Sequence, residues 1–242
     1  MFQEKKIRSV PFLQVSELEG VTGLVHAFTL RGTDRACGLE RDPDQATRKT
    51  SVLEVLGLSE AETTQLHQSH SNRICRAARP SVKRPEGDAL VLTKPGVYGI
   101  IKTADCLPIL AIDPDRKQLA VIHAGWRGTL GRILSEALLQ LTTLGSNPAD
   151  LLVVLGPCIR VCCYEVGPNF KDRFANQGHD VEHLFRGRNL DLIAASRAQA
   201  EAAGTSQILD SGMCTCCSPD LFYSHRRDRD HRRMWALAGF SA

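Results

Sequence analysis

The chain has 242 residues, of which 43% are hydrophobic and 24% are charged, and these proportions exclude a largely disordered protein. Its 30 Lys and Arg residues against 27 Asp and Glu residues give a net charge of +3, too balanced for a surface that binds nucleic acid. No apolar run approaches the ~20 residues of a membrane span, and no hydrophobic segment follows the basic start. We therefore expect a cytoplasmic protein with reduced cysteines, folded as one domain over residues 1–242.

The predicted order of elements is mixed: strands dominate the middle of the chain and helices flank them. Residues 43–56 are predicted as a helix that begins at a proline and ends before Gly57. Residues 88–101 are predicted as a strand, a turn and a second strand. The later elements are short buried strands over 107–112, 118–123 and 151–156, and helices over 130–144 and 190–203. This order predicts an α/β (α+β) sandwich with a mixed β-sheet.

Three residues with reactive side chains lie at predicted strand ends. His70 closes the segment His67–His70, Cys106 falls between two strands, and His123 ends a strand before a glycine-rich turn. Two imidazoles and one thiolate are a suitable ligand set for Zn²⁺, and they disfavour Mg²⁺ or Ca²⁺. The spacings of 36 and 17 residues match no short metal motif. The same cysteine and histidine therefore fit a nucleophile and its base, or buried structural residues, as well.

The turn Gly125–Thr129 opens the helix predicted after His123. Backbone N–H groups at a helix start favour anions, and Arg127 adds a permanent positive charge with a forked donor. Phosphate binding there and a plain tight turn with a surface arginine are both compatible with the sequence. The pattern matches no known nucleotide-binding loop.

The last third of the chain is rich in cysteine. Six cysteines form a Cys-x-x-x-Cys-Cys and a Cys-x-Cys-Cys group: Cys158, Cys162, Cys163, Cys214, Cys216 and Cys217. They could build a structural zinc site, but the usual paired Cys-x-x-Cys form is missing. Packed free thiols are the favoured interpretation.

Six short motifs, in order, resemble those of one protein family. They are Phe28–Gly32 (FTLRG), Gln68–Ser71 (QSHS), Thr103–Pro108 (TADCLP), His123–Gly128 (HAGWRG), Gly156–Gly167 with GPCI and CYEVG, and Phe222–Asp228 (FYSHRRD). The chain resembles the YfiH-like family, also called the laccase-domain or "multicopper polyphenol oxidase" family, from about Phe28 onward. It departs from the family pattern at Ser71, where many members have glycine, and at the spacer Arg160-Val161.

The resemblance implies a fold, an activity and a set of site residues. The fold is a mixed-sheet α/β sandwich distantly related to toxin deamidases. The activity is phosphorolysis of adenosine, inosine, guanosine and 5′-methylthioadenosine to the base and ribose 1-phosphate, with adenosine deamination beside it. The metal ligands fall on His70, Cys106 and His123. The copper label fits poorly, because a multicopper site needs roughly ten histidines in His-x-His pairs, and this chain has eight, none so paired.

Three hypotheses follow from these residues. The first is a zinc-containing purine nucleoside phosphorylase with adenosine deaminase activity. In it His70, Cys106 and His123 hold zinc, which lowers the pKa of water toward ~7. Asp105 transfers protons or orients a ligand, or merely bonds within its turn. Arg127 or Arg31 holds phosphate.

The second hypothesis is a metal-independent hydrolase or deamidase with Cys106 as nucleophile and His123 as base. The third is a purine-binding or thiol-sensing protein without turnover. The preferred nucleoside, the native metal, with copper as the less favoured choice, and the oligomeric state are left open by the sequence.

Overall fold

The computed structural model describes residues 1–37 and 51–242, and two six-stranded sheets form its centre. The first sheet has the spatial order β1 (Phe2–Ile7), β2 (Val10–Val15), β3 (Leu24–Thr29), β14 (Met234–Phe240), β7 (Val97–Thr103) and β4 (Thr63–Gln65). The second has the order β13 (Gln207–Asp210), β10 (Leu152–Leu155), β8 (Leu107–Asp113), β9 (Gln118–Ala124), β6 (Ala89–Leu92) and β5 (Ile74–Ala77).

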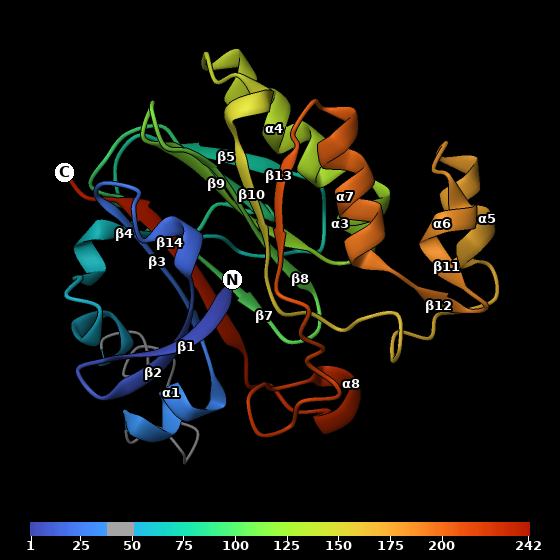
Figure 1. Cartoon of the computed structure of the whole chain (residues 1–242), viewed down its shortest axis with the longest axis horizontal. Helices are drawn as coiled ribbons and strands as arrows, with labels where there is room; N and C mark the ends of the chain where they lie inside the picture. The colour runs from blue at the N-terminus through green and yellow to red at the C-terminus, as the bar shows by residue number, and fades with distance from the viewer. Residues whose placement is uncertain (38–50) are drawn as a thin grey trace.

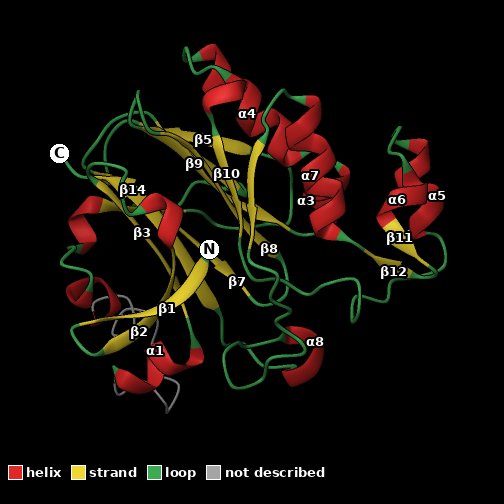
Figure 2. Ribbon diagram, in the orientation of Figure 1, coloured by secondary structure: helices red, strands yellow, loops and turns green. Residues whose placement is uncertain are grey.

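Both sheets are mixed. Most neighbouring strands run antiparallel, while β4 and β7, β5 and β6, and β10 and β13 pair in parallel. The helices are α1 (Arg31–Ala36), α3 (Trp126–Leu130), α4 (Ile133–Thr143), α5 (Phe170–Asn176), α6 (Val181–Leu184), α7 (Leu192–Ala202) and α8 (His225–Asp228), with a small ribbon of β11 (Phe185–Arg186) and β12 (Asn189–Leu190) beside α5 and α6. Short 3₁₀ turns span Ser16–Leu18, Glu60–Glu62 and Pro148–Asp150. Figures 1 and 2 show α3, α4 and α7 along one side of the second sheet.

The core follows the alternation of side chains along the strands. In β9, Val121 belongs to the apolar cluster between the two sheets, whereas Ile122 belongs to the cluster beneath α4 and α7. The sheets approach closely at Gly99 of β7, where an added Cβ would lie 2.9 Å from Val121 Cγ2. The second sheet is therefore buried on both faces, as its continuous apolar runs require. The mixed α/β sandwich predicted from the sequence is confirmed.

The helices and strands predicted from the sequence are confirmed in part. The strands over 107–112, 118–123 and 151–156 and the helix over 190–203 are present. The two strands predicted over 88–101 exist, but β6 and β7 lie in different sheets, so they form an arch and not a hairpin. The predicted helix 43–56 lies partly outside the described residues, and residues 51–55 are helical.

The helix predicted over 130–144 is present as α4, and a break at Gly131 and Arg132 separates it from the short helix α3. Arg132 takes a left-handed φ of 58° at the break. Asn72 Nδ2 donates to the carbonyl oxygen of Gly131 at 3.0 Å, and a Cβ on Gly131 would lie 3.0 Å from the same nitrogen. The break thus lets the loop that follows β4 pack against the start of the helices. No helix in the described part of the chain has the length and apolar character of a bilayer span.

Candidate functional site

The register of β8 and β9 brings Cys106 and His123 together. Pro108 pairs directly with His123, so Cys106, two residues before Pro108, is a diagonal neighbour of His123 on the same face of the sheet. That face carries Val121, whose side chain packs between the two sheets. Both site residues therefore lie at one end of the space between the sheets, where the apolar core gives way to an opening.

His70 joins them from the loop between β4 and β5. Its backbone has a left-handed φ of 58°, and its ring meets that of His123 edge-on, with centroids 4.9 Å apart. One donor atom from each of His70, Cys106 and His123 lies within 4.8 Å of the other two. The structure thus brings together all three residues that the sequence singled out.

Asp88, which was not identified from the sequence, organises this cluster. Its carboxylate is fully buried, and Oδ1 accepts a hydrogen bond from His123 Nδ1 at 2.7 Å. The same carboxylate accepts the backbone N–H groups of Ser69, His70 and Ser71, at 3.3, 3.1 and 2.6 Å, and the Ser71 hydroxyl at 2.7 Å. One side chain therefore fixes the tautomer of His123 and the loop that carries His70. The only signal in the sequence was an aspartate directly before a buried strand.

The electrostatics favour a charged cluster. Burial alone would raise the pKa of the Cys106 thiol, but His123 and His70 lower it to about 6. Burial alone would lower the pKa of His123, but the thiolate of Cys106 and the carboxylate of Asp88 raise it to about 9. Without a metal ion the pair is therefore a thiolate and an imidazolium at neutral pH. A cation that replaces the imidazolium proton would keep the thiolate and leave Nε2 of His123 as a ligand.

The donor set fits a transition-metal ion. Because Nδ1 of His123 is engaged with Asp88, Nε2 is the ring nitrogen left to bind a metal. Gly125 lies against the cluster, and an added Cβ would lie 3.1 Å from Cys106 Sγ and 3.3 Å from His70 Cδ2. Two imidazoles and one thiolate leave a fourth tetrahedral position for water or substrate, the arrangement of catalytic zinc sites.

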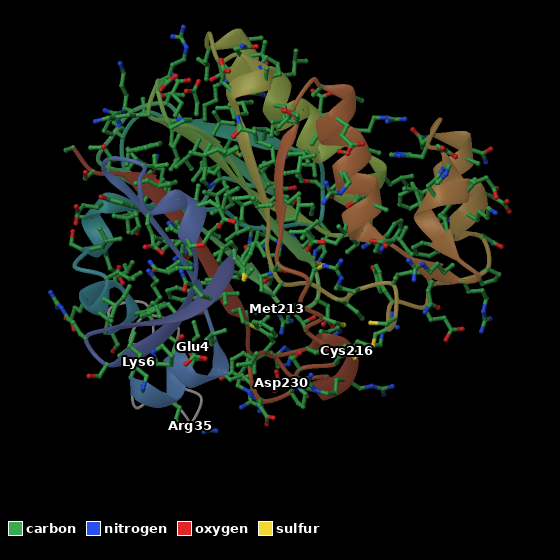
Figure 3. All side chains as sticks on the ribbon, viewed as in Figure 1. Glu4, Lys6, Arg35, Met213, Cys216 and Asp230 are labelled. Atoms are coloured by element: carbon green, nitrogen blue, oxygen red, sulfur yellow. The ribbon has the colours of Figure 1, made fainter. Side chains whose placement is uncertain are left out.

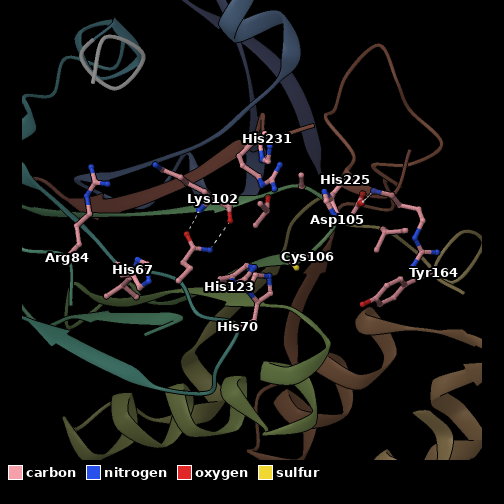
Figure 4. A pocket seen from close by; sticks show the side chains of 17 residues that line it. His67, His70, Arg84, Lys102, Asp105, Cys106, His123, Tyr164, His225 and His231 are labelled. Carbon is pink, nitrogen blue, oxygen red and sulfur yellow. Dashed lines mark hydrogen bonds between the residues drawn. The ribbon is translucent and has the colours of Figure 1, made fainter. Parts of the chain in front are cut away.

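The cluster lies in the wall of a cavity of about 670 Å³, within the usual range for small-molecule sites. Basic side chains are frequent in this wall: His67, Arg84, Lys102, His225, Arg226, His231 and Arg233. Tyr164 closes one side, with the Arg226 guanidinium 5.5 Å from the centre of its ring. In Figure 4, Lys102 and His231 lie on the other side of the pocket from His70 and His123. The cavity therefore combines the His70–Cys106–His123 cluster with positive charge.

Gln68 holds the strand end that borders the cavity. Its amide bonds both backbone groups of Lys102: Nε2 donates to the carbonyl oxygen, and Oε1 accepts the N–H, each at 2.8 Å (Figure 4). These two bonds tie the loop of His70 to the end of β7. The Gln in the segment before His70 thus has a structural reason that the sequence did not reveal.

Asp105 lines the cavity but is committed to other bonds. Its Oδ1 accepts from Thr215 Oγ1 and its Oδ2 from the Arg226 backbone N–H, each at 2.7 Å, and its carbonyl oxygen accepts from Ile159 N. Its left-handed φ of 86° turns the chain sharply before Cys106. These bonds favour a positioning role over proton transfer, because both carboxylate oxygens already serve two distant loops.

The two arginines predicted to bind phosphate lie elsewhere among the described residues. The Arg127 guanidinium stacks 4.5 Å from the centre of the Trp126 ring, and α3, which it belongs to, is only five residues long. Arg31 NH1 donates to the Pro219 carbonyl oxygen at 2.8 Å, and its guanidinium lies near Tyr223. Neither residue lines the cavity. The prediction of an anion site at the start of the helix after His123 did not identify the cations of the cavity. These cations come from five separate segments of the chain.

Comparison with known proteins gives consistent results. The family model described as "Multi-copper polyphenol oxidoreductase laccase" matches residues 36–241. A purine nucleoside phosphorylase of Deinococcus radiodurans is 37% identical over 88% of each chain, and Purine nucleoside phosphorylase YlmD of Bacillus subtilis is 30% identical over 83% of this chain and 78% of its own. Adenosine deaminase RL5, from an unknown prokaryotic organism, is 34% identical over 58% of this chain and 56% of its own.

Solved structures share the whole architecture. The crystal structure of Bacillus licheniformis hypothetical protein YfiH aligns with a TM-score of 0.86 and 26% identity over 99% of both chains. YlmD from Geobacillus stearothermophilus aligns with a TM-score of 0.85 and 27% identity over 100% of this chain and 99% of its own. The fold around the cluster is therefore shared by these proteins.

Proposed function

Since the chain belongs to the laccase-like YfiH family, whose relatives place it among enzymes of nucleoside metabolism, we propose that it is a purine nucleoside phosphorylase with a zinc-containing site. The family resemblance seen in the sequence is confirmed. The proposed substrates are adenosine, inosine, guanosine and 5′-methylthioadenosine together with phosphate, and residues 1–242 act as one catalytic unit. A relative named as an adenosine deaminase supports adenosine deamination as a second reaction.

The observation that carries the proposal is the His70–Cys106–His123 cluster in the wall of a basic cavity. Phosphorolysis breaks the bond between C1′ of the ribose and the purine nitrogen, and a phosphate oxygen takes its place on C1′. The incoming phosphate is an anion, and the departing purine gains electron density. Cations in the cavity can hold the first and a proton donor must neutralise the second.

Phosphate is best placed against the cations that line the cavity. Lys102, Arg84 and Arg233 line the same cavity from three separate segments of the chain. The geometry favours these residues over Arg127 and Arg31. Tyr164 offers an aromatic face on which a purine ring can stack.

Zinc is the metal that this donor set suits best. The Asp88 carboxylate holds the proton of His123 on Nδ1 and so keeps Nε2 available as a ligand, while the lowered pKa of Cys106 keeps its sulfur as thiolate. When bound, zinc would supply a Lewis acid for the activation of water in adenosine deamination, which releases inosine and ammonia. The described residues offer one mixed His–Cys cluster, too few ligands for several coppers.

Metal content and product analysis on one purified sample test the proposal. We expect zinc in the protein, and adenine and ribose 1-phosphate from adenosine plus phosphate, with inosine as the product of deamination. Cys106→Ala should lose both products, whereas Cys75→Ser, which changes a half-buried cysteine in β5, should keep them. Full turnover by Cys106→Ala would overturn the proposed site.

A second candidate function has one specific observation in its favour. Asp88, His123 and Cys106 are also arranged as an orienting carboxylate, a base and a thiolate, which is the arrangement of a metal-independent cysteine hydrolase or deamidase. That function predicts that iodoacetamide modifies Cys106 and abolishes activity, and that a chelator has no effect. Loss of activity on chelation, with recovery on addition of zinc, would exclude it.

A further inference from the structure

Four cysteines outside the proposed active site converge on one point. They come from two loops, one between β10 and α5 and the other between β13 and α8: Cys162, Cys163, Cys214 and Cys217. Their sulfur atoms all lie within 4.8 Å of one another. Cys217 Sγ lies 3.7 Å from Cys162 Sγ and 3.3 Å from Cys163 Sγ. Figure 3 labels Cys216 in the second loop, next to this cluster in the chain.

These separations match those of a tetrahedral metal site. With Zn–S bonds of about 2.3 Å, the edges of a tetrahedron of four sulfurs measure about 3.8 Å. A disulfide would instead require sulfurs about 2.05 Å apart, and none of these cysteines is bonded to another. The arrangement is thus wide enough for an ion at its centre and too wide for covalent pairs.

The backbone around the cluster is built to receive thiolates. Cys158 and Cys214 form a parallel β-bridge that joins the two loops, and the N–H of Arg160 donates to Cys214 Sγ at 3.5 Å. Such N–H donors to sulfur stabilise the charged form.

We propose a second metal site in this protein, a structural zinc ion held by four thiolates: Cys162, Cys163, Cys214 and Cys217. With four protein ligands it has no position for substrate, so its function is to fix the two loops. It is separate from the proposed reaction and does not depend on it.

The two loops also form part of the cavity wall. Tyr164, which lines the cavity, directly follows Cys163. Thr215, which directly follows Cys214, donates to Asp105, the residue before Cys106. The guanidinium of Arg226 bonds the carbonyl oxygens of Cys163 and Glu165, and that of Arg227 bonds those of Thr215 and Cys216. Zinc would therefore join two loops that the arginines of α8 also hold, Arg226 binding the first loop and Arg227 the second.

The test measures the number of zinc ions per chain in variants whose His70–Cys106–His123 cluster has been disabled. In Cys106→Ala, which lacks the thiolate of the His–Cys–His cluster, we expect one tightly held zinc per chain by elemental analysis. Adding Cys162→Ser and Cys217→Ser should reduce that count to zero and lower the melting temperature. Adding Cys75→Ser as a matched control should leave it at one. A Cys106→Ala protein that is folded and free of zinc would overturn the proposal.

Spectroscopy and intact mass give a second test that does not depend on the serine variants. Cobalt added to metal-free Cys106→Ala, prepared under reducing conditions, should produce the sulfur-to-metal charge-transfer bands of a tetrathiolate site. Added zinc should then displace the cobalt and remove the bands. A spectrum without these bands would refute the site. An intact mass showing that the four cysteines form two disulfides in freshly purified protein would refute it as well.

Discussion

Replacing Asp88 by asparagine tests whether one buried carboxylate organises the His70–Cys106–His123 cluster. The carboxylate accepts five hydrogen bonds, two on Oδ1 and three on Oδ2. Asparagine keeps one acceptor oxygen and presents an NH₂ group in place of the other. With the NH₂ toward His123, the imidazole loses its acceptor and its preference for a proton on Nδ1. With the NH₂ toward Ser71, the loop of His70 is left with unpaired donors.

Either orientation weakens metal binding. The loss of such an outer partner costs 10- to 100-fold in metal affinity, which is about 1.4–2.7 kcal/mol. The loss also removes one of the two groups, the Cys106 thiolate being the other, that hold the pKa of His123 high in the metal-free protein. We therefore expect the free zinc concentration that gives half-maximal activity to rise 10- to 100-fold in Asp88→Asn.

The assay is purine release at a series of buffered free zinc concentrations. Because Asp88→Asn leaves the four cysteines of the second proposed site unchanged, a structural zinc there affects the variant and the wild type alike. Asp113→Asn is the matched control, since Asp113 is also buried but bonds the N–H of Arg116 at the far end of β8. If Asp88→Asn reached half-maximal activity at the same free zinc concentration as the wild type, the role of Asp88 in organising the cluster would be refuted.

Three further predictions concern pH, steric fit and the core. Burial lowers the pKa of His26 to about 4, from 6.5 in the unfolded chain, so the unfolded chain binds one more proton between these values. The free energy of unfolding should therefore fall by about 3 kcal/mol as the pH drops from 6.5 to 4. In His26→Gln this fall should be smaller, which denaturant titration at both pH values would measure. Gly125→Ala places a methyl group 3.1 Å from Cys106 Sγ, so kcat should drop at least ~10-fold while the melting temperature changes little; an unchanged kcat would contradict this. Leu138→Ala removes a fully buried side chain of α4 and should cost about 2–5 kcal/mol of stability by urea unfolding, with the zinc content of the folded protein unchanged.

The local elements and the three residues of the His70–Cys106–His123 cluster could be predicted from the sequence. Continuous apolar runs predict buried strands such as β8 and β9, and Gly204 marks the end of α7 just beyond its last residues. These signals could be used because they depend only on residues that are neighbours in the sequence. His70, Cys106 and His123 stood out as reactive residues at strand ends, and the family motifs gave them a common role.

Tertiary structure alone decided how these pieces meet. Asp88 reaches His123 across 35 residues, and the cavity gathers cations from segments between His67 and Arg233. Register and the choice of sheet are set by contacts between distant residues, and a local pattern carries no information on them. For the same reason the two strands over 88–101 could be predicted, but not that β6 and β7 lie in different sheets. The convergence of Cys162, Cys163, Cys214 and Cys217 from two loops was likewise visible only in the tertiary structure. The sequence determined which chemical groups are present, and the packing of two sheets determined which of them act together.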